Sequence, residues 1–170
     1  MSSTDTGLPD AEAVLAALAE RMASAVAHDA AFVGIYSGGA WVAERLAQMV
    51  PGAHPVGFID VAFYRDDYKR TGLKSNTKRT ELPFDVEGAT IVLVDDVLYT
   101  GRSVRAAVNE LFDFGRPDRV ELAVLVDRGG RELPVEPTYT GARLAVARDL
   151  SIVLARDASG RLALGVEPAA

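Results

Sequence analysis

The chain has 170 residues, of which 49% are apolar and 25% charged, and its formal net charge is −6. This composition is typical of a globular domain and excludes disordered, collagen-like and coiled-coil chains. The absence of cysteine excludes disulfide bonds and thiolate metal sites, and no apolar run reaches the roughly 18 residues that a membrane span requires. We therefore expect a soluble cytoplasmic protein with no membrane partner.

The first half of the chain predicts helices that alternate with strands. Residues 1–8 are expected to form a flexible tail, and residues 9–170 a single domain. Apolar residues at helical spacing predict a first helix that Asp10 caps at its amino end. The expected elements are a helix at 11–27, a strand at 31–36, a helix at 40–49 and a strand at 56–64.

The second half continues this alternation and then changes to short β segments. Ser103 is the expected N-cap of a helix that stops at Gly115. The expected elements are a strand at 91–94, a helix at 104–114, a strand at 120–126 and a hairpin of strands at 151–155 and 162–166. Strands that alternate with helices predict an α/β fold, a doubly wound and mostly parallel sheet with flanking helices. The hairpin would add a small β hood at the C-terminal end of the domain.

The run 91–105, IVLVDDVLYTGRSVR, carries the clearest chemical signal. An apolar strand delivers Asp95 and Asp96 to its carboxyl end, and a loop of small residues then opens a helix. Backbone N–H groups, hydroxyl groups and the positive end of the helix dipole make such a loop a phosphate site, and Gly101 lets the backbone approach the anion. Carboxylates beside a phosphate site indicate sugar hydroxyls or a Mg²⁺ ion as their partners. The sequence therefore predicts a sugar-phosphate ligand.

Other interpretations compete with this one. A P-loop ATPase would need the motif G-x-x-x-x-G-K-[ST], which is absent, and an aspartyl phosphatase would need an Asp where Val97 lies. The glycines between residues 34 and 39 lack the Rossmann spacing. In a purely structural interpretation Asp95 and Asp96 only end a strand, which the chemistry of the following loop disfavours.

Four segments resemble a known family. The run VLVDDVLYTGRS resembles the phosphoribosyl-pyrophosphate signature of the type I phosphoribosyltransferases. Together with it, VGIYSGGAWVAERL, FYRDD and LVDRGGRELP resemble the PyrR family, whose members regulate the pyrimidine operon and are also uracil phosphoribosyltransferases. The resemblance covers most of residues 33–141 and implies the type I phosphoribosyltransferase fold.

The resemblance also implies roles for particular residues. Asp95 and Asp96 would be catalytic and would bind the ribose hydroxyls of phosphoribosyl pyrophosphate. The residues that would hold its 5-phosphate are Tyr99, Thr100, Gly101, Arg102 and Ser103. Ser37, Gly38 and Gly39 would bind pyrophosphate, although the family usually has Thr at position 37 and often Arg at position 38. The cofactor would be Mg²⁺, held mainly by the substrate and not by protein side chains alone.

The resemblance places the uracil pocket at Val126, Asp127 and Arg128, mainly through main-chain groups that match the carbonyl and N–H groups of the base. Many family members have His at position 130, where this chain has Gly130. Two alternatives stay open: a phosphoribosyltransferase for another base, such as hypoxanthine, and a catalytically idle sensor of uridine nucleotides.

Basic residues gather in one segment of this acidic chain. Residues 65–80 hold six basic and two acidic side chains, a local charge of +4, which leaves −10 for the rest. A basic segment on an acidic protein favours one anionic ligand over a nucleic-acid coat. In the family a flexible loop at this place closes over the active site. Arg65, Lys78 and Arg79 are therefore the expected catalytic cations, which would stabilise pyrophosphate as it leaves.

The same charge balance separates two functions that the family combines. Synthesis of UMP from uracil in pyrimidine salvage is the favoured function. Binding of a leader RNA is possible but disfavoured by the acidic charge, because RNA affinity depends on neutralising phosphates. The family's RNA-binding members carry basic residues in the first helix and a Lys after the glycine at 141, where this chain has DAEAVLAALAE and Ala142. The family also suggests a homodimer or a larger homo-oligomer.

Overall fold

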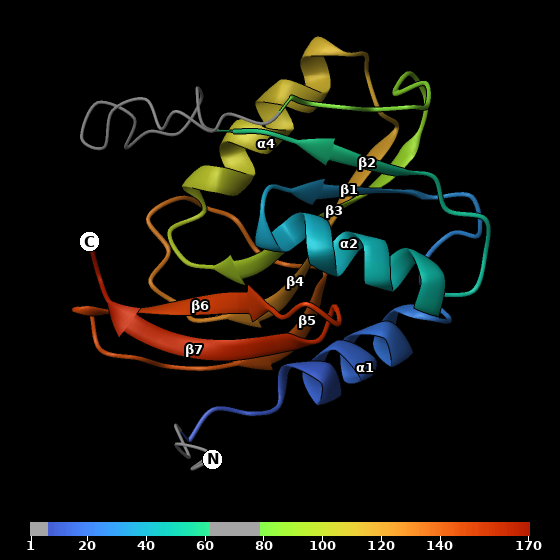
Figure 1. Cartoon of the computed structure of the whole chain (residues 1–170). Coiled ribbons are helices and arrows are strands. Elements are labelled where there is room, and N and C mark those ends of the chain that lie inside the picture. Colours follow the sequence, from blue (N-terminus) through green and yellow to red (C-terminus); the bar gives the residue numbers. More distant parts are fainter. Residues whose placement is uncertain (1–6, 62–78) are drawn as a thin grey trace.

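Five parallel strands form a central sheet in the order β2-β1-β3-β4-β5 (Figure 1). The computed structural model describes residues 7–61 and 79–170. The strands are β1 (Ala31–Ile35), β2 (Val56–Ile59), β3 (Thr90–Leu98), β4 (Arg119–Asp127) and β5 (Tyr139–Arg143). Because all five run in the same direction, their carboxyl ends meet at one edge of the sheet, where open α/β folds bind ligands.

Helices cover both faces of this sheet (Figure 1). They are α1 (Ala11–Met22), α2 (Gly38–Met49) and α4 (Arg102–Asp113). Val92 and Val94 of β3 join the core that contains α1 and α2, whereas Ile91 and Leu93 join the core that contains α4. A strand buried on both faces has no polar face, which explains the continuous apolar run in β3. The prediction of a doubly wound α/β sheet is confirmed.

A hairpin of β6 (Leu150–Arg156) and β7 (Leu162–Pro168) forms a separate antiparallel sheet. Asp157 fixes its turn, because its Oδ1 atom accepts hydrogen bonds from the backbone N–H groups two and four residues later. Ile152 and Leu162 are buried in the core that α1 and α2 share. The predicted C-terminal hood is therefore this hairpin, and it packs on the same side as those two helices.

One partly buried carboxylate joins the hairpin to both helices. The two carboxylate oxygens of Glu12 accept hydrogen bonds from the Arg45 guanidinium at 3.1 and 2.7 Å, and Oε1 also accepts one from the Leu162 N–H at 2.8 Å. These donors, the Arg45 guanidinium first, lower the pKa of Glu12 from 4.5 to about 2 because they favour its charged form. Helices α1 and α2 and strand β7 are thus linked through a single side chain.

The end of α1 and the start of α2 differ from the predicted boundaries. α1 ends at Met22, but the Val26 N–H still donates to the Met22 carbonyl at 3.0 Å, and this extra turn keeps Val26 buried. The apolar residues therefore keep their helical spacing as far as Val26, although α1 ends at Met22. α2 begins at residue 38 and not at residue 40. Asp10 occupies the N-cap position of α1, although its side chain makes no capping hydrogen bond.

At α4 the predicted cap is wrong. The helix begins at Arg102, and its N-cap is Gly101, whose φ of 93° lies in the left-handed region, whereas Ser103 already lies inside the helix. Glycine adopts this conformation without the steric cost that other residues meet, so it sets the angle at which the chain enters the helix. The predicted stop at Gly115 is confirmed, since this residue follows the last helical turn with a φ of 150°.

Strands β3, β4, β6 and β7 are longer than predicted, β1 and β2 are shorter, and β5 was not predicted. β3 runs to Leu98 and so contains Asp95 and Asp96, which were expected after its end. β5 is paired along the outer edge of β4 but has no clear strand pattern in sequence. The predicted strand 56–64 ends at residue 59, and its residues 62–64 lie outside the described part of the chain. Among the described residues, no helix has the length and apolar character needed to cross a bilayer.

Candidate active site

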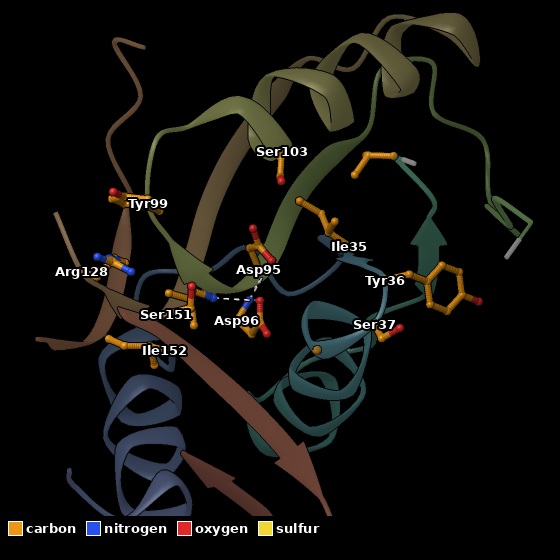
Figure 2. A pocket seen from close by; sticks show the side chains of 13 residues that line it. Ile35, Tyr36, Ser37, Asp95, Asp96, Tyr99, Ser103, Arg128, Ser151 and Ile152 are labelled. Carbon is orange, nitrogen blue, oxygen red and sulfur yellow. Dashed lines mark hydrogen bonds between the residues drawn. The ribbon is translucent and has the colours of Figure 1, made fainter. Parts of the chain in front are cut away.

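A cavity of about 290 Å³ lies at the carboxyl ends of β1 and β3, with β6 as a further wall (Figure 2). Figure 2 shows Asp95 and Asp96 between Ser37 on one side and Ser151 and Arg128 on the other. The residues that line this pocket are Ile35, Tyr36, Ser37, Gly38, Val61, Asp95, Asp96, Val97, Tyr99, Ser103, Arg128, Ser151 and Ile152. Residues from both halves of the sequence therefore face one space.

The two adjacent carboxylates are held by the backbone of their own strand. The Asp96 N–H donates to Asp95 Oδ1 at 2.9 Å, and the Val97 N–H donates to Asp96 Oδ1 at 2.9 Å. Asp95 is 7% exposed and belongs to the buried surface of the strand end. These bonds fix the direction of each carboxyl group before a ligand arrives, and both groups line the pocket as predicted.

Residues 37–39, the N-cap and the first two residues of α2, are called the glycine turn below. Its backbone lies directly on the end of β3: a Cβ atom added to Gly39 would be 2.6 Å from the Val94 carbonyl oxygen, and one added to Gly38 would be 2.2 Å from Asp96 Oδ2. The peptide bond between Tyr36 and Ser37 is cis. Glycine is therefore required at position 39, because a side chain there would push the turn away from the carboxylates.

Residues 99–103, which connect β3 to α4 and include the first two residues of that helix, are called the phosphate loop below. Ser103 and Tyr99 line the pocket, and the amino end of α4 opens beside it. The Arg102 N–H donates to Thr100 Oγ1 at 3.2 Å, so the Thr100 hydroxyl shapes the loop. Thr100, Gly101 and Arg102 are not lining residues, and the Arg102 guanidinium donates to Glu132 Oε2 at 2.8 and 3.2 Å. The helix end and its hydroxyl group are nevertheless suited to an anion.

Of the three residues predicted to bind uracil, Arg128 alone lines the pocket. Its guanidinium lies 3.9 Å from the centre of the Tyr99 ring, and its Nη1 atom donates to the Leu150 carbonyl at 2.8 Å. Val126 is fully buried in β4 between Val97 of β3 and Ala142 of β5. The Asp127 carboxylate is paired with an arginine of the next loop and does not line this pocket.

The predicted catalytic cations fall mostly outside this description. Arg65 and Lys78 lie among residues 62–78, beyond the described part of the chain. Arg79 is exposed and is not among the residues that line the pocket. Their role stays a prediction.

The structure adds lining residues that the sequence did not indicate. Ser151 and Ile152 come from the hairpin, and they reach the pocket because β6 docks beside β3. No local signal marks them, since their positions depend on contacts between segments more than 50 residues apart. Tyr36 and Val61 also line the pocket, and Tyr36 follows β1 immediately before the glycine turn.

A parallel sheet with adjacent carboxylates at the end of β3, a glycine turn after β1 and a phosphate loop that opens a helix defines a type I phosphoribosyltransferase. A family model described as phosphoribosyl transferase domain matches residues 8–146. A protein of Ralstonia nicotianae called bifunctional protein PyrR is 54% identical over 155 residues, which cover 89% of this chain and 88% of that protein. A protein of the same name from Nitrosococcus oceani is 47% identical over 139 residues, 81% of this chain and 78% of its own.

The chain therefore belongs to the PyrR family within the type I phosphoribosyltransferases, and it is a pentosyltransferase. Solved structures agree on the fold. A hypoxanthine-guanine phosphoribosyltransferase of Bacillus anthracis matches with a TM-score of 0.67 at 17% identity, over 88% of both chains. The enzyme of Leishmania tarentolae in complex with GMP matches with a TM-score of 0.62 at 19% identity, over 82% of this chain and 81% of its own.

Proposed function

We propose that the chain transfers the phosphoribosyl group of phosphoribosyl pyrophosphate to uracil, with Mg²⁺, to give UMP and pyrophosphate. The bond between C1 of the ribose and the pyrophosphate oxygen breaks, a bond from C1 to N1 of uracil forms, and the N1 proton is released. One observation carries the proposal: the two carboxylates, the glycine turn and the amino end of α4 all face the same cavity of about 290 Å³. A ligand with a diol, a pyrophosphate and a phosphate needs these three surfaces together.

The carboxylates would serve the sugar. Asp95 and Asp96 are oriented by backbone N–H groups at 2.9 Å and would accept hydrogen bonds from the ribose hydroxyls. As the bond to pyrophosphate lengthens, positive charge develops on the ribose, and preorganised carboxylates nearby would stabilise it. The phosphate loop would hold the 5-phosphate through the amino end of α4 and the Ser103 hydroxyl.

The donor set suits a Mg²⁺ ion that the substrate brings. Mg²⁺ is usually bound by one or two carboxylates together with substrate phosphates and water. Asp95 and Asp96 are such a pair, and residues 7–61 and 79–170 contain no cluster of three or more His, Cys, Asp or Glu side chains placed to hold a metal. When bound, the ion would supply neutralisation of the pyrophosphate oxygens as they leave.

The charge of the leaving group needs further cations. Of the described residues that line the pocket, Arg128 is the one basic side chain. The same pocket also contains the two acidic side chains Asp95 and Asp96. Pyrophosphate would therefore depend on Mg²⁺ and on the basic segment, with Arg65, Lys78 and Arg79 as the proposed contributors.

The base would lie between the carboxylates and the hairpin. Arg128, Ser151 and Ile152 border this side of the pocket. Main-chain groups of residues 126–128 stay the proposed partners of the uracil carbonyl and N–H groups, and of these three residues Arg128 lines the pocket. The relatives named bifunctional protein PyrR, at 47–54% identity, support uracil. Hypoxanthine, the base in the names of the solved neighbours, is the alternative that the assay must include.

An assay of nucleotide synthesis tests the proposal. Purified protein is mixed with phosphoribosyl pyrophosphate, Mg²⁺ and one base at a time, and we expect UMP to form while hypoxanthine and guanine give no product. Turnover of a purine without turnover of uracil would overturn the base assignment. Asp95→Asn and Asp96→Asn each remove one charged acceptor and are expected to lower kcat/KM by about 10- to 100-fold. The matched control is Asp118→Asn, an exposed aspartate beside β4 that is expected to retain activity.

A second function is binding of a leader RNA, which the word bifunctional in the relatives' name favours. The net charge of −6 works against it, because phosphate contacts supply most of the affinity for RNA. Filter binding to a pyrimidine-operon leader, with and without UMP and over a salt series, tests this function. Light scattering tests the proposed homo-oligomer.

A further inference from the structure

We propose that the ion pair between Asp127 and Arg131 is a positioning device that fixes the phosphate loop, so that the pair sets the affinity for phosphoribosyl pyrophosphate and not the recognition of the base. The inference rests on the proposed function for its substrates. It assigns Asp127 a role other than the uracil contact that the sequence implies. It concerns the segment after β4, residues 128–135, which is called the β4 loop below.

Each of the three side-chain nitrogen atoms of Arg131 donates a hydrogen bond to a different neighbour. Nη2 donates to Asp127 Oδ2 at 2.7 Å, Nη1 donates to the Tyr99 carbonyl at 2.9 Å, and Nε donates to the Val135 carbonyl at 2.8 Å. One guanidinium thus joins the end of β4, the first residue of the phosphate loop and the last residue of the β4 loop. Its fork geometry suits this task, and a lysine could not make all three bonds at once.

Both carboxylate oxygens of Asp127 accept hydrogen bonds within this arrangement. Oδ2 accepts from Arg131, and Oδ1 accepts from the Gly129 N–H at 2.9 Å. The carboxyl group is 7% exposed, and burial alone would raise its pKa, but the bonds from Arg131 and Gly129 outweigh burial and hold the pKa below its usual range. Both oxygens are therefore occupied by protein donors, which is the pattern of a structural carboxylate.

The backbone of the β4 loop adds two further bonds to the phosphate loop. The Glu132 and Leu133 N–H groups both donate to the Thr100 carbonyl at 3.0 Å. The Val135 side chain lies against Gly101, since a Cβ atom added to Gly101 would be 3.1 Å from Val135 Cγ2. Two successive carbonyls of the phosphate loop, those of residues 99 and 100, are thus held by the β4 loop.

This arrangement would hold the phosphate loop in one conformation. Gly101 is left-handed and permissive, so the loop needs external contacts to stay in one conformation. A loop that is already ordered loses less conformational entropy when the phosphate binds, and the affinity is correspondingly higher. If Arg131 were instead a contact for a free anion, it would have to give up bonds to Asp127 and to two carbonyls.

The base side has an additional anchor in the hairpin. Arg128 stacks on the Tyr99 ring and donates to the Leu150 carbonyl of the hairpin, whereas Arg131 contacts Tyr99 only through its main-chain carbonyl. Loss of the Asp127–Arg131 pair should therefore affect the sugar-phosphate end of the pocket more than the base end. This difference separates a positioning role from general destabilisation.

The experiment compares three variants with one control. Arg131→Gln removes the ion pair and most donors, Arg131→Lys keeps the charge, and Asp127→Asn keeps the shape of the side chain. The control is Arg119→Gln, which breaks the ion pair between the exposed Arg119 and the buried Glu121 at the other end of the same strand. Binding of phosphoribosyl pyrophosphate with Mg²⁺ is measured by calorimetry, which needs no turnover, and the KM of each substrate is measured where uracil is turned over.

We expect Arg131→Gln to weaken binding of phosphoribosyl pyrophosphate by about 10- to 30-fold, with a smaller loss in Arg131→Lys, while the KM for uracil changes less than about threefold. The double variant Asp127→Asn with Arg131→Gln should bind like Arg131→Gln alone, because the pair acts as a unit. Arg119→Gln should bind like the unaltered chain. If the proposed function is wrong, the result is different: the unaltered chain binds phosphoribosyl pyrophosphate but does not turn over uracil.

Two results would overturn the inference. One is a folded Arg131→Gln protein that binds phosphoribosyl pyrophosphate as tightly as the unaltered chain. The other is an equal rise in KM for both substrates, which would show a general loss of structure. If Arg131→Gln does not fold, Arg131→Lys and Asp127→Asn give the same comparison, and unchanged binding in both would also overturn the inference.

Discussion

Gly39→Ala tests how closely the glycine turn must lie on the carboxylates. The added Cβ atom would be 2.6 Å from the Val94 carbonyl oxygen and 3.1 Å from the Asp95 Cα atom. A comfortable C···O contact is about 3.3–3.6 Å, so the shortfall is roughly 0.7–1 Å. Both neighbours are backbone atoms of a central strand, which cannot rotate away. The turn itself must move, and with it Ser37.

The expected cost has two parts. Crowding of this kind destabilises a fold by about 1–3 kcal/mol, which lowers the Tm of a chain of this size by roughly 2–4 °C per kcal/mol. Displacement of a binding group by about 1 Å lowers activity by up to about 100-fold, so kcat/KM for phosphoribosyl pyrophosphate should fall far more than stability alone explains. Steady-state kinetics and thermal denaturation measure the two parts separately.

Gly165→Ala is the matched control for this substitution. Its added Cβ atom would be 3.5 Å from Val153 Cγ2, an ordinary contact, and the residue lies in β7 without a left-handed conformation. We expect activity within about twofold of the unaltered chain, because no neighbour has to move. A folded Gly39→Ala protein with full activity would refute the claim that the close approach of the turn to β3 matters for catalysis.

Three further predictions concern stability and the two ends of the pocket. Glu12→Gln should lower the free energy of unfolding by about 1–2 kcal/mol above pH 5, a figure that allows for solvent screening of the partly exposed Arg45. Urea unfolding measures the effect, and Glu20→Gln is the control. Because the pKa of Glu12 is lowered to about 2 in the fold, the contribution is complete above pH 4.5 and is lost as the pH falls toward 2; a difference between the two proteins that persists at pH 2 would contradict this. Gly101→Ala should lower the free energy of unfolding by about 1–2 kcal/mol, because alanine is strained at a φ of 93°. It should also weaken binding of phosphoribosyl pyrophosphate, measured by calorimetry. Unchanged binding would contradict the role given to the conformation of Gly101. Arg128→Gln should raise the KM for uracil by about 3- to 10-fold through loss of the bond to the Leu150 carbonyl, and a larger rise in the KM for phosphoribosyl pyrophosphate would show that Arg128 serves the other end of the pocket.

The parts of the site that were predictable are those encoded by one continuous segment. Asp95, Asp96 and Ser103 lie within nine residues, and a buried strand followed by a loop and a helix fixes their relative positions. The glycine turn is predictable for the same reason, since it joins β1 directly to α2. The sheet is likewise encoded by apolar runs that need burial on both faces.

The parts that were not predictable depend on distant contacts. Ser151 and Ile152 reach the pocket through docking of the hairpin on β3, which no local pattern describes. Asp127 follows a run of apolar residues in the sequence much as Asp95 does, yet Arg131 four residues later pairs with its carboxylate. The helix cap was misplaced because Ser103 has the side chain of a typical cap, whereas the backbone geometry of Gly101 decides where α4 begins.

The hairpin follows the strands of the central sheet along the chain, and this order has a consequence for shortened forms of the protein. All five strands of the central sheet lie between residues 31 and 143, so a chain that lacks β6 and β7 still contains the sequence of every one of them. In such a chain the pocket would lack the wall that Ser151 and Ile152 provide, and Arg128 would lack its bond to the Leu150 carbonyl. A stalled or truncated product that ends before β6 would thus carry the carboxylates and the phosphate loop with the base side open to water.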